Sequence, residues 1–124
     1  MILGVGVDIV QINRIEKSIK NFGDTFLDKI FTNDEIAFCY KRKDPYPCLA
    51  ARFAAKEAII KCLASHLSVP LLHIEVAVSE EGKPSIKAGE SLEEAFKKMG
   101  VEHVHLSLSH EKKYAVAYAI VESK

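Results

Sequence analysis

A long helical stretch in the middle of the chain, from about Pro47 to Leu67, constrains the fold most strongly. Proline suits the first position of a helix, because its missing N–H has no partner there, and the interior is rich in Ala and Leu, which are strong helix formers. At about 100° per residue, the charged side chains Arg52 and Lys56 fall inside or beside the apolar arc of this helix. A surface helix separates its charges from its apolar stripe, and this one does not.

Glu57 and Lys61 lie one turn apart on the same stretch, and two interpretations remain open for them. In the first interpretation, the two residues form a simple ion pair on a solvated strip, and such a pair stabilises a helix by only about 0.2–0.5 kcal/mol. In the second, both sides of the helix are covered and the charges point into a cleft. In that case a carboxylate and an ammonium group would face something charged.

Length and composition predict a single domain over residues 1–124 with a sizeable core, because 48% of the residues are hydrophobic. The net charge is zero, so the overall charge indicates neither nucleic acid nor an anionic membrane surface as a partner. The three cysteines are odd in number and none has CxxC spacing, which predicts reduced thiols. No apolar run reaches the roughly 18 residues of a membrane span, and no signal peptide is recognisable. We therefore expect a cytoplasmic protein.

The pattern of apolar residues predicts an α+β fold, with one long and several shorter helices packed on a mostly antiparallel sheet. Two capping boxes, Thr32–Glu35 and Ser91–Glu94, mark the starts of short helices. The predicted strands cover residues 2–10, 74–78, 84–87, 103–110 and 114–121, and the predicted helices cover 13–22, 33–40, 47–67 and 91–99.

The first predicted strand carries Asp8 among apolar residues. A carboxylate in such a strand is costly unless it is paired, hydrogen-bonded or bound to a metal ion; alternatively, Asp8 caps the exposed end of the strand. Gly4 and Gly6 invite a dinucleotide-binding interpretation, but the third glycine of that fingerprint is missing and both lie inside the strand.

Basic residues gather at two places outside the long helix. Arg14, Lys17 and Lys20 recur every three residues on the first helix, where they form a solvated face or a strip that an acidic partner helix would fit. The proline-broken loop from Lys41 to Pro47 is the best candidate for a segment that touches anions.

Histidines occur on the predicted strand 103–110. His103 and His105 share a face but lack an evident third metal ligand, so solvent-facing histidines are favoured. His110 stands at the strand end, where functional residues are often placed.

Three separated segments in this order resemble the 4′-phosphopantetheinyl transferases, in particular their small bacterial type. They are Gly6-Val7-Asp8-Ile9-Val10 with Arg14, Phe53-Ala54-Ala55-Lys56-Glu57-Ala58-Ile59-Ile60-Lys61, and Ser107-Leu108-Ser109-His110. Enzymes of this family move the phosphopantetheine arm of coenzyme A onto a serine of acyl carrier protein and release 3′,5′-ADP. The resemblance covers nearly the whole chain.

The resemblance implies a role for each matching residue. Asp8 and Glu57 would bind Mg²⁺, Lys61 would stabilise or protonate the leaving phosphate, and Glu57 would take the proton of the serine, directly or through water. The residues implied in coenzyme A binding are Arg52, Lys56, Gly82, Lys83, Pro84, Ser109 and His110. Arg14, Lys17 and Lys20 would meet the acidic helix of the carrier protein, and the family builds its sites between the subunits of a homotrimer.

Two other functions remain as alternatives. A non-catalytic module that binds coenzyme A or a nucleotide would need the cationic residues, but it has no use for Asp8 and Glu57 together. A Mg²⁺-dependent phosphohydrolase would use water in place of the serine. Cleavage of coenzyme A without carrier protein would indicate the hydrolase, and metal-independent binding without turnover would indicate the module.

Overall fold

The computed structural model describes all residues from 1 to 124 and contains helices and antiparallel strands, as predicted. The elements in chain order are β1 (Ile2–Gln11), α1 (Ile12–Phe22), α2 (Asp24–Ile30), α3 (Asn33–Tyr40), α4 (Tyr46–Cys62), the 3₁₀ turn η1 (Leu71–His73), β2 (Ile74–Val78), β3 (Pro84–Ala88), α5 (Glu90–Met99), β4 (His103–His110) and β5 (Tyr114–Glu122). The α+β class and the mostly antiparallel pairing are confirmed.

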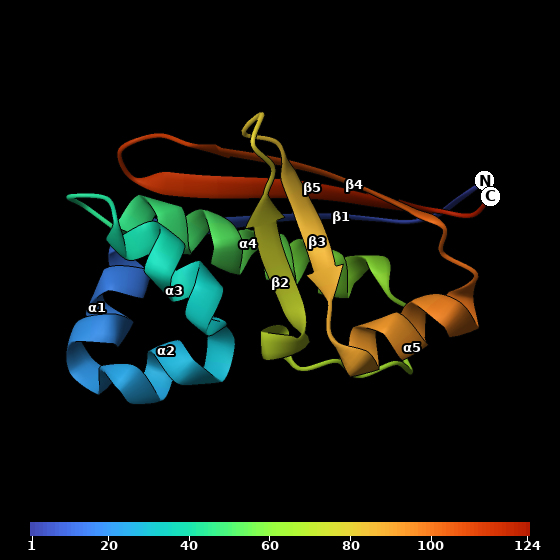
Figure 1. Ribbon diagram of the computed structural model, residues 1–124, viewed down its shortest axis with the longest axis horizontal. Helices are drawn as coiled ribbons and strands as arrows, with labels where there is room; N and C mark the ends of the chain where they lie inside the picture. The colour runs from blue at the N-terminus through green and yellow to red at the C-terminus, as the bar shows by residue number, and fades with distance from the viewer.

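The strands form two separate sheets rather than one. Three of them pair antiparallel in the order β1-β5-β4, and β2 and β3 form an antiparallel hairpin of their own. Helix α4 runs along the three-stranded sheet, and the β2–β3 hairpin crosses in front of it (Figure 1). Helix α4 is therefore covered by the sheet on one side and by the hairpin and α3 on another, which explains why it lacks a polar face.

Small residues let α4 lie close against the sheet. Ala54, Ala55 and Ala58 of the helix and Ala117 and Ala119 of β5 are all fully buried in one core cluster. Gly4 and Gly6 of β1 complete this contact, because a Cβ atom at Gly6 would overlap the carbonyl oxygen of Ala58 and one at Gly4 the carbonyl oxygen of Cys62. The two glycines thus serve helix–strand packing.

Several sequence-based boundaries were wrong. Helix α4 ends at Cys62 rather than near Leu67. A further helix, α2, begins directly after Gly23, whose φ of 57° turns the chain while its carbonyl accepts the first helical hydrogen bonds. The capping box Thr32–Glu35 is present, but Ser91 lies inside α5 and does not cap it. Its hydroxyl instead contacts Nδ1 of His73 at 2.5 Å, a tertiary partner that local sequence could not reveal.

The prediction of reduced thiols was wrong for two of the three cysteines. Cys39 in α3 and Cys48 in the first turn of α4 form a disulfide, with their Cα atoms 5.5 Å apart. Cys62 is free and buried, and burial raises the pKa of its thiol to about 11. The pairing depends on the turn between α3 and α4, which no cysteine spacing encodes.

None of the helices combines the length and the apolar character that a membrane crossing requires.

Candidate functional site

The first cluster of functional side chains lies where α4 packs on β1. Lys61 Nζ donates a hydrogen bond to the carbonyl oxygen of Val7 (2.8 Å) and lies 3.4 Å from Oδ1 of Asp8. The close approach of the helix at Gly6 makes both contacts possible. The structure thus brings Asp8 of the first strand and Lys61 of the long helix together, across 53 residues of sequence.

Glu57 belongs to the same cluster, since it stands one turn before Lys61 on α4. Burial raises the pKa of its carboxyl, the negative charge of Asp8 raises it further, and Lys61 acts in the opposite direction. Two carboxylates and one ammonium group therefore share a partly desolvated place. A further cation beside Glu57 would favour the ionised form of its carboxyl group.

The donor set at this cluster suits Mg²⁺, which prefers one or two carboxylates and fills its other positions with phosphate oxygens and water. The protein holds no group of three or more His, Cys, Asp or Glu side chains that could bind a metal ion alone. Asp8 and Glu57 would thus hold the ion together with further oxygen atoms, supplied by water and by the phosphates of a bound ligand.

The second feature is a cavity of about 420 Å³ between the N-terminal half of α4, the end of β4 and the tip of the β2–β3 hairpin. Its lining includes five of the seven residues that the sequence suggested for coenzyme A binding: Arg52, Gly82, Pro84, Ser109 and His110. Arg42 and Asp44 of the loop before α4 also line it. The sequence predicts that this loop touches anions, but it does not single out these two residues.

Arg52 is an unusual side chain in this cavity, because it is only 4% exposed and is incompletely paired. Its Nη1 donates to Sγ of Cys48 at 3.2 Å, whereas its Nε has no hydrogen-bond partner. The guanidinium groups of Arg52 and Arg42 both lie over the ring of Phe38, at 4.4 and 4.7 Å from its centroid. Burial lowers the pKa of Arg52, the negative charge of Glu35 acts in the opposite direction, and Arg42 lowers it further. Two neighbouring cations with an unused donor favour an anionic ligand.

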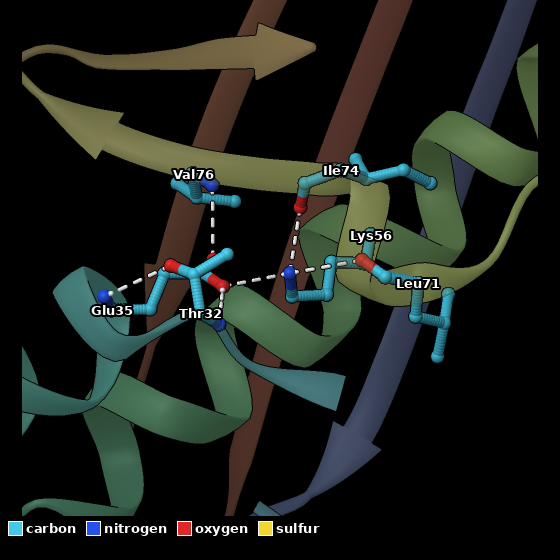
Figure 2. Close-up of polar contacts among 6 residues, drawn as sticks. All are labelled: Thr32, Glu35, Lys56, Leu71, Ile74 and Val76. Atoms are coloured by element: carbon cyan, nitrogen blue, oxygen red, sulfur yellow. Dashed lines mark hydrogen bonds and ion pairs between the residues drawn. The ribbon is translucent and has the colours of Figure 1, made fainter. Parts of the chain in front are cut away.

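Lys56 and Lys83 do not line this cavity. Lys56 is fully buried, and its ammonium group is bonded to Glu35 and to two backbone carbonyls instead (Figure 2). Lys83 is exposed in the hairpin turn next to Gly82. In this structure the Lys56 ammonium group is therefore turned to Glu35 and not to the cavity, and its contact with coenzyme A stays a prediction. Its charge and its neighbours in sequence gave no sign that Glu35 lies beside it.

The two features lie on different sides of α4. The directions of Arg52 and Glu57 differ by about 140° around the helix axis. Lys61 reaches toward β1, whereas Arg52 faces the cavity beside the β2–β3 hairpin. One chain therefore carries the carboxylates and the cationic cavity at two separate places.

The basic residues Arg14, Lys17 and Lys20 of α1 are all exposed. Lys20 bonds Glu16 at 2.7 Å, while Arg14 and Lys17 have no acidic partner. Two cationic groups on this helix are thus free to meet an acidic surface.

Comparison with known proteins identifies the class. The chain belongs to the 4′-phosphopantetheinyl transferase superfamily, whose family model matches residues 4–119. It is therefore an enzyme of that class, and the family resemblance deduced from the sequence is confirmed.

Its relatives carry a more particular name, holo-[acyl-carrier-protein] synthase. The protein of Halothermothrix orenii is 40% identical over 123 residues, with 98% of each chain covered. That of Thermodesulfovibrio yellowstonii is 43% identical over 121 residues, with 98% of this chain and 99% of the relative covered.

Solved structures agree. The crystal structure of holo-[acyl-carrier-protein] synthase from Neisseria meningitidis has a TM-score of 0.90 at 33% identity, covering 99% of this chain and all of that one. The Bacillus anthracis enzyme, solved in complex with coenzyme A (3′,5′-ADP), has a TM-score of 0.81 at 36% identity, covering 100% of this chain and 99% of that one.

Proposed function

We propose that this chain, as one transferase domain over residues 1–124, transfers the 4′-phosphopantetheine group of coenzyme A to a serine of apo-acyl carrier protein. The products are holo-acyl carrier protein and 3′,5′-ADP. The strongest support from the chain itself is Arg52, a buried guanidinium with an unused donor in a cavity that also holds Arg42. Two cationic side chains in one cavity favour an anionic ligand, and the relatives are named for this reaction.

Coenzyme A carries several phosphate groups, and its phosphates match the cationic lining of the cavity. In this proposal Arg52, Arg42 and His110 bind phosphate oxygens through charge-assisted hydrogen bonds. Gly82, Pro84 and Ser109 form the neighbouring walls. Gly82 has a φ of 84°, which only glycine adopts without strain, so the hairpin tip keeps its shape without a side chain in the way.

Asp8 and Glu57 would hold Mg²⁺, which neutralises the charge of the pyrophosphate when bound. Glu57 would take the proton of the attacking serine, directly or through water, because a carboxylate within reach of the hydroxyl can act as a general base. Lys61 is held by Val7 and Asp8 and would stabilise or protonate the phosphate oxygen that leaves.

A homotrimer would bring the carboxylates of one subunit to the cationic cavity of its neighbour. The carboxylates and the cavity lie on different sides of α4, so a neighbouring subunit would have to supply one of them. Val5, Val7 and Ile9 on the outer face of β1 are each more than half exposed, and Tyr118 of β5 is 49% exposed beside them. Burying this apolar face would drive assembly. We expect Val7→Lys to yield a monomer by light scattering and to lose transfer activity; an active monomer would refute shared sites.

The carrier protein would dock on α1, where Arg14 and Lys17 are exposed and have no acidic partner in the chain. A strip of this kind steers an acidic helix toward the site. We place the enzyme in the cytoplasm on the basis of the family resemblance.

The test is the intact mass of a purified apo-acyl carrier protein after incubation with coenzyme A, Mg²⁺ and this protein. We expect a gain of one phosphopantetheine group that disappears when EDTA is added. Coenzyme A binding without any gain would favour the binding module. Release of 3′,5′-ADP in the absence of carrier protein would favour the hydrolase.

A further inference from the structure

The β2–β3 hairpin supplies one wall of the cavity, and its attachment to the rest of the chain is specific. Val78 ends β2 and lines the cavity, and the turn that follows carries Gly82 and Pro84. The hairpin is not part of the three-stranded sheet, so its position depends on contacts with helices and on its packing beside β4. A shift of β2 would move this wall of the cavity.

A buried ion pair closes the free edge of β2 (Figure 2). Lys56 Nζ donates to the carbonyl oxygen of Ile74 at 2.6 Å, and Glu35 Oε2 accepts the backbone N–H of Val76 at 2.9 Å. The two side chains meet at 2.8 Å between Lys56 Nζ and Glu35 Oε1. The pair thus occupies the place that a neighbouring strand would take, bonding one carbonyl and one N–H of β2.

Both side chains of the pair are hydrogen-bonded within the protein. An ammonium group has three N–H donors, and those of Lys56 are matched by Glu35, Ile74 and the carbonyl oxygen of Leu71 at 3.1 Å. Glu35 also accepts the backbone N–H of Thr32 at 2.9 Å. Both side chains have no exposed area. Lys56 therefore has no donor left for a ligand, in contrast to Arg52, four residues earlier on the same helix.

We propose that Lys56 and Glu35 are positioning residues that fix the β2–β3 hairpin against α4 and thereby set the affinity for coenzyme A. The proposal rests on the proposed function, because it takes the cavity as the coenzyme A site. A buried ion pair is a poor source of stability compared with apolar residues of similar size. Its directional bonds, however, hold α3, α4 and β2 in one register, which apolar packing alone would not specify.

The test compares the double variant Glu35→Gln/Lys56→Met with the wild-type enzyme. The double substitution removes both charges, so that neither is left buried and unpaired. We expect KM for coenzyme A to rise about tenfold while kcat at saturating coenzyme A changes little, since Asp8, Glu57 and Lys61 lie on the other side of α4. KM for carrier protein should stay unchanged.

A matched control separates positioning from loss of stability. Leu27 is buried in α2 and does not line the cavity, so Leu27→Ala should destabilise the protein without changing KM for coenzyme A. Should the double variant fail to fold, Glu35→Gln alone leaves Lys56 bonded to its two carbonyls and should raise KM in the same direction by a smaller factor.

Amide hydrogen exchange tests the proposal independently of turnover. Relative to the wild-type protein, the double variant should speed amide exchange in β2 and β3 more than in β1, β4 and β5. Leu27→Ala should not speed exchange in the hairpin more than in the other strands. If the wild-type protein does not modify carrier protein, the proposed function fails, and exchange still reports whether the pair holds the hairpin. An unchanged KM together with unchanged hairpin exchange, or a loss confined to kcat, would overturn the positioning role.

Discussion

Replacing Gly6 with alanine should move Glu57 and Lys61 away from Asp8 while leaving all three side chains chemically unchanged. The added Cβ atom would overlap the carbonyl oxygen of Ala58 and lie 2.9 Å from its carbonyl carbon and 3.1 Å from Cβ of Lys61. Carbon atoms pack comfortably at about 3.5–4.0 Å, so α4 would have to withdraw from β1 by about 1 Å. Two of the three atoms belong to backbone, which cannot turn aside as a flexible side chain can.

The magnitude follows from this displacement. Overpacking of a core contact costs about 1–3 kcal/mol of stability. The same withdrawal would stretch the 2.8 Å bond between Lys61 and the carbonyl of Val7 and move Glu57 away from Asp8. A misplacement of about 1 Å can cost about 100-fold in rate. We therefore expect kcat of Gly6→Ala to fall about 100-fold in a protein that still folds.

The assay combines urea unfolding with kcat from the mass change of carrier protein. Gly4→Ala is the matched control, because its Cβ would meet the backbone of Cys62 at the same interface, farther along α4 from Glu57. It should lose similar stability and much less activity. A folded Gly6→Ala enzyme with wild-type kcat would refute the reasoning, and equal losses of kcat in both variants would trace the effect to general loosening.

Three further predictions concern charge and covalent linkage. Burial and Asp8 raise the pKa of Glu57 in the fold, so its ionisation opposes folding once the pH exceeds the ordinary carboxyl range. Glu57→Gln should therefore raise the melting temperature of the metal-free protein at neutral pH, and this gain should vanish as the pH falls below the ordinary carboxyl range. The same variant should abolish transfer, because it removes the proposed base. Arg14→Glu should raise KM for carrier protein and leave KM for coenzyme A nearly unchanged; equal changes would give α1 another role. Reducing Cys39–Cys48 with a dithiol should lower the free energy of unfolding by about 2.5 kcal/mol, the loop-closure value for this separation, and identical urea midpoints with and without the dithiol would contradict it.

The sequence by itself determined most of the elements, though not α2 or the end of α4, and it singled out many residues of the candidate site. A nearly continuous apolar run predicted β1, and alternating residues predicted β2 and β4. The Thr32–Glu35 capping box predicted the start of α3, and the spacing of Glu57 and Lys61 placed both on one side of α4. The Asp8, Glu57 and His110 segments led to the family, which the superfamily match confirms. These features are local, and helix periodicity and capping depend on residues only a few positions apart.

Only the tertiary structure decided what each side chain meets. Arg52 and Lys56 look alike in the sequence, since both are cations one turn apart on α4. The fold leaves Arg52 incompletely paired in a cavity and gives Lys56 three acceptors, among them Glu35 from 21 residues away. It also brings Cys39 to Cys48 and Gly6 against the backbone of Ala58. Periodicity fixes the direction in which a side chain points, but its partner is set by packing between distant elements, and that packing determines whether a buried charge binds a ligand or holds the fold.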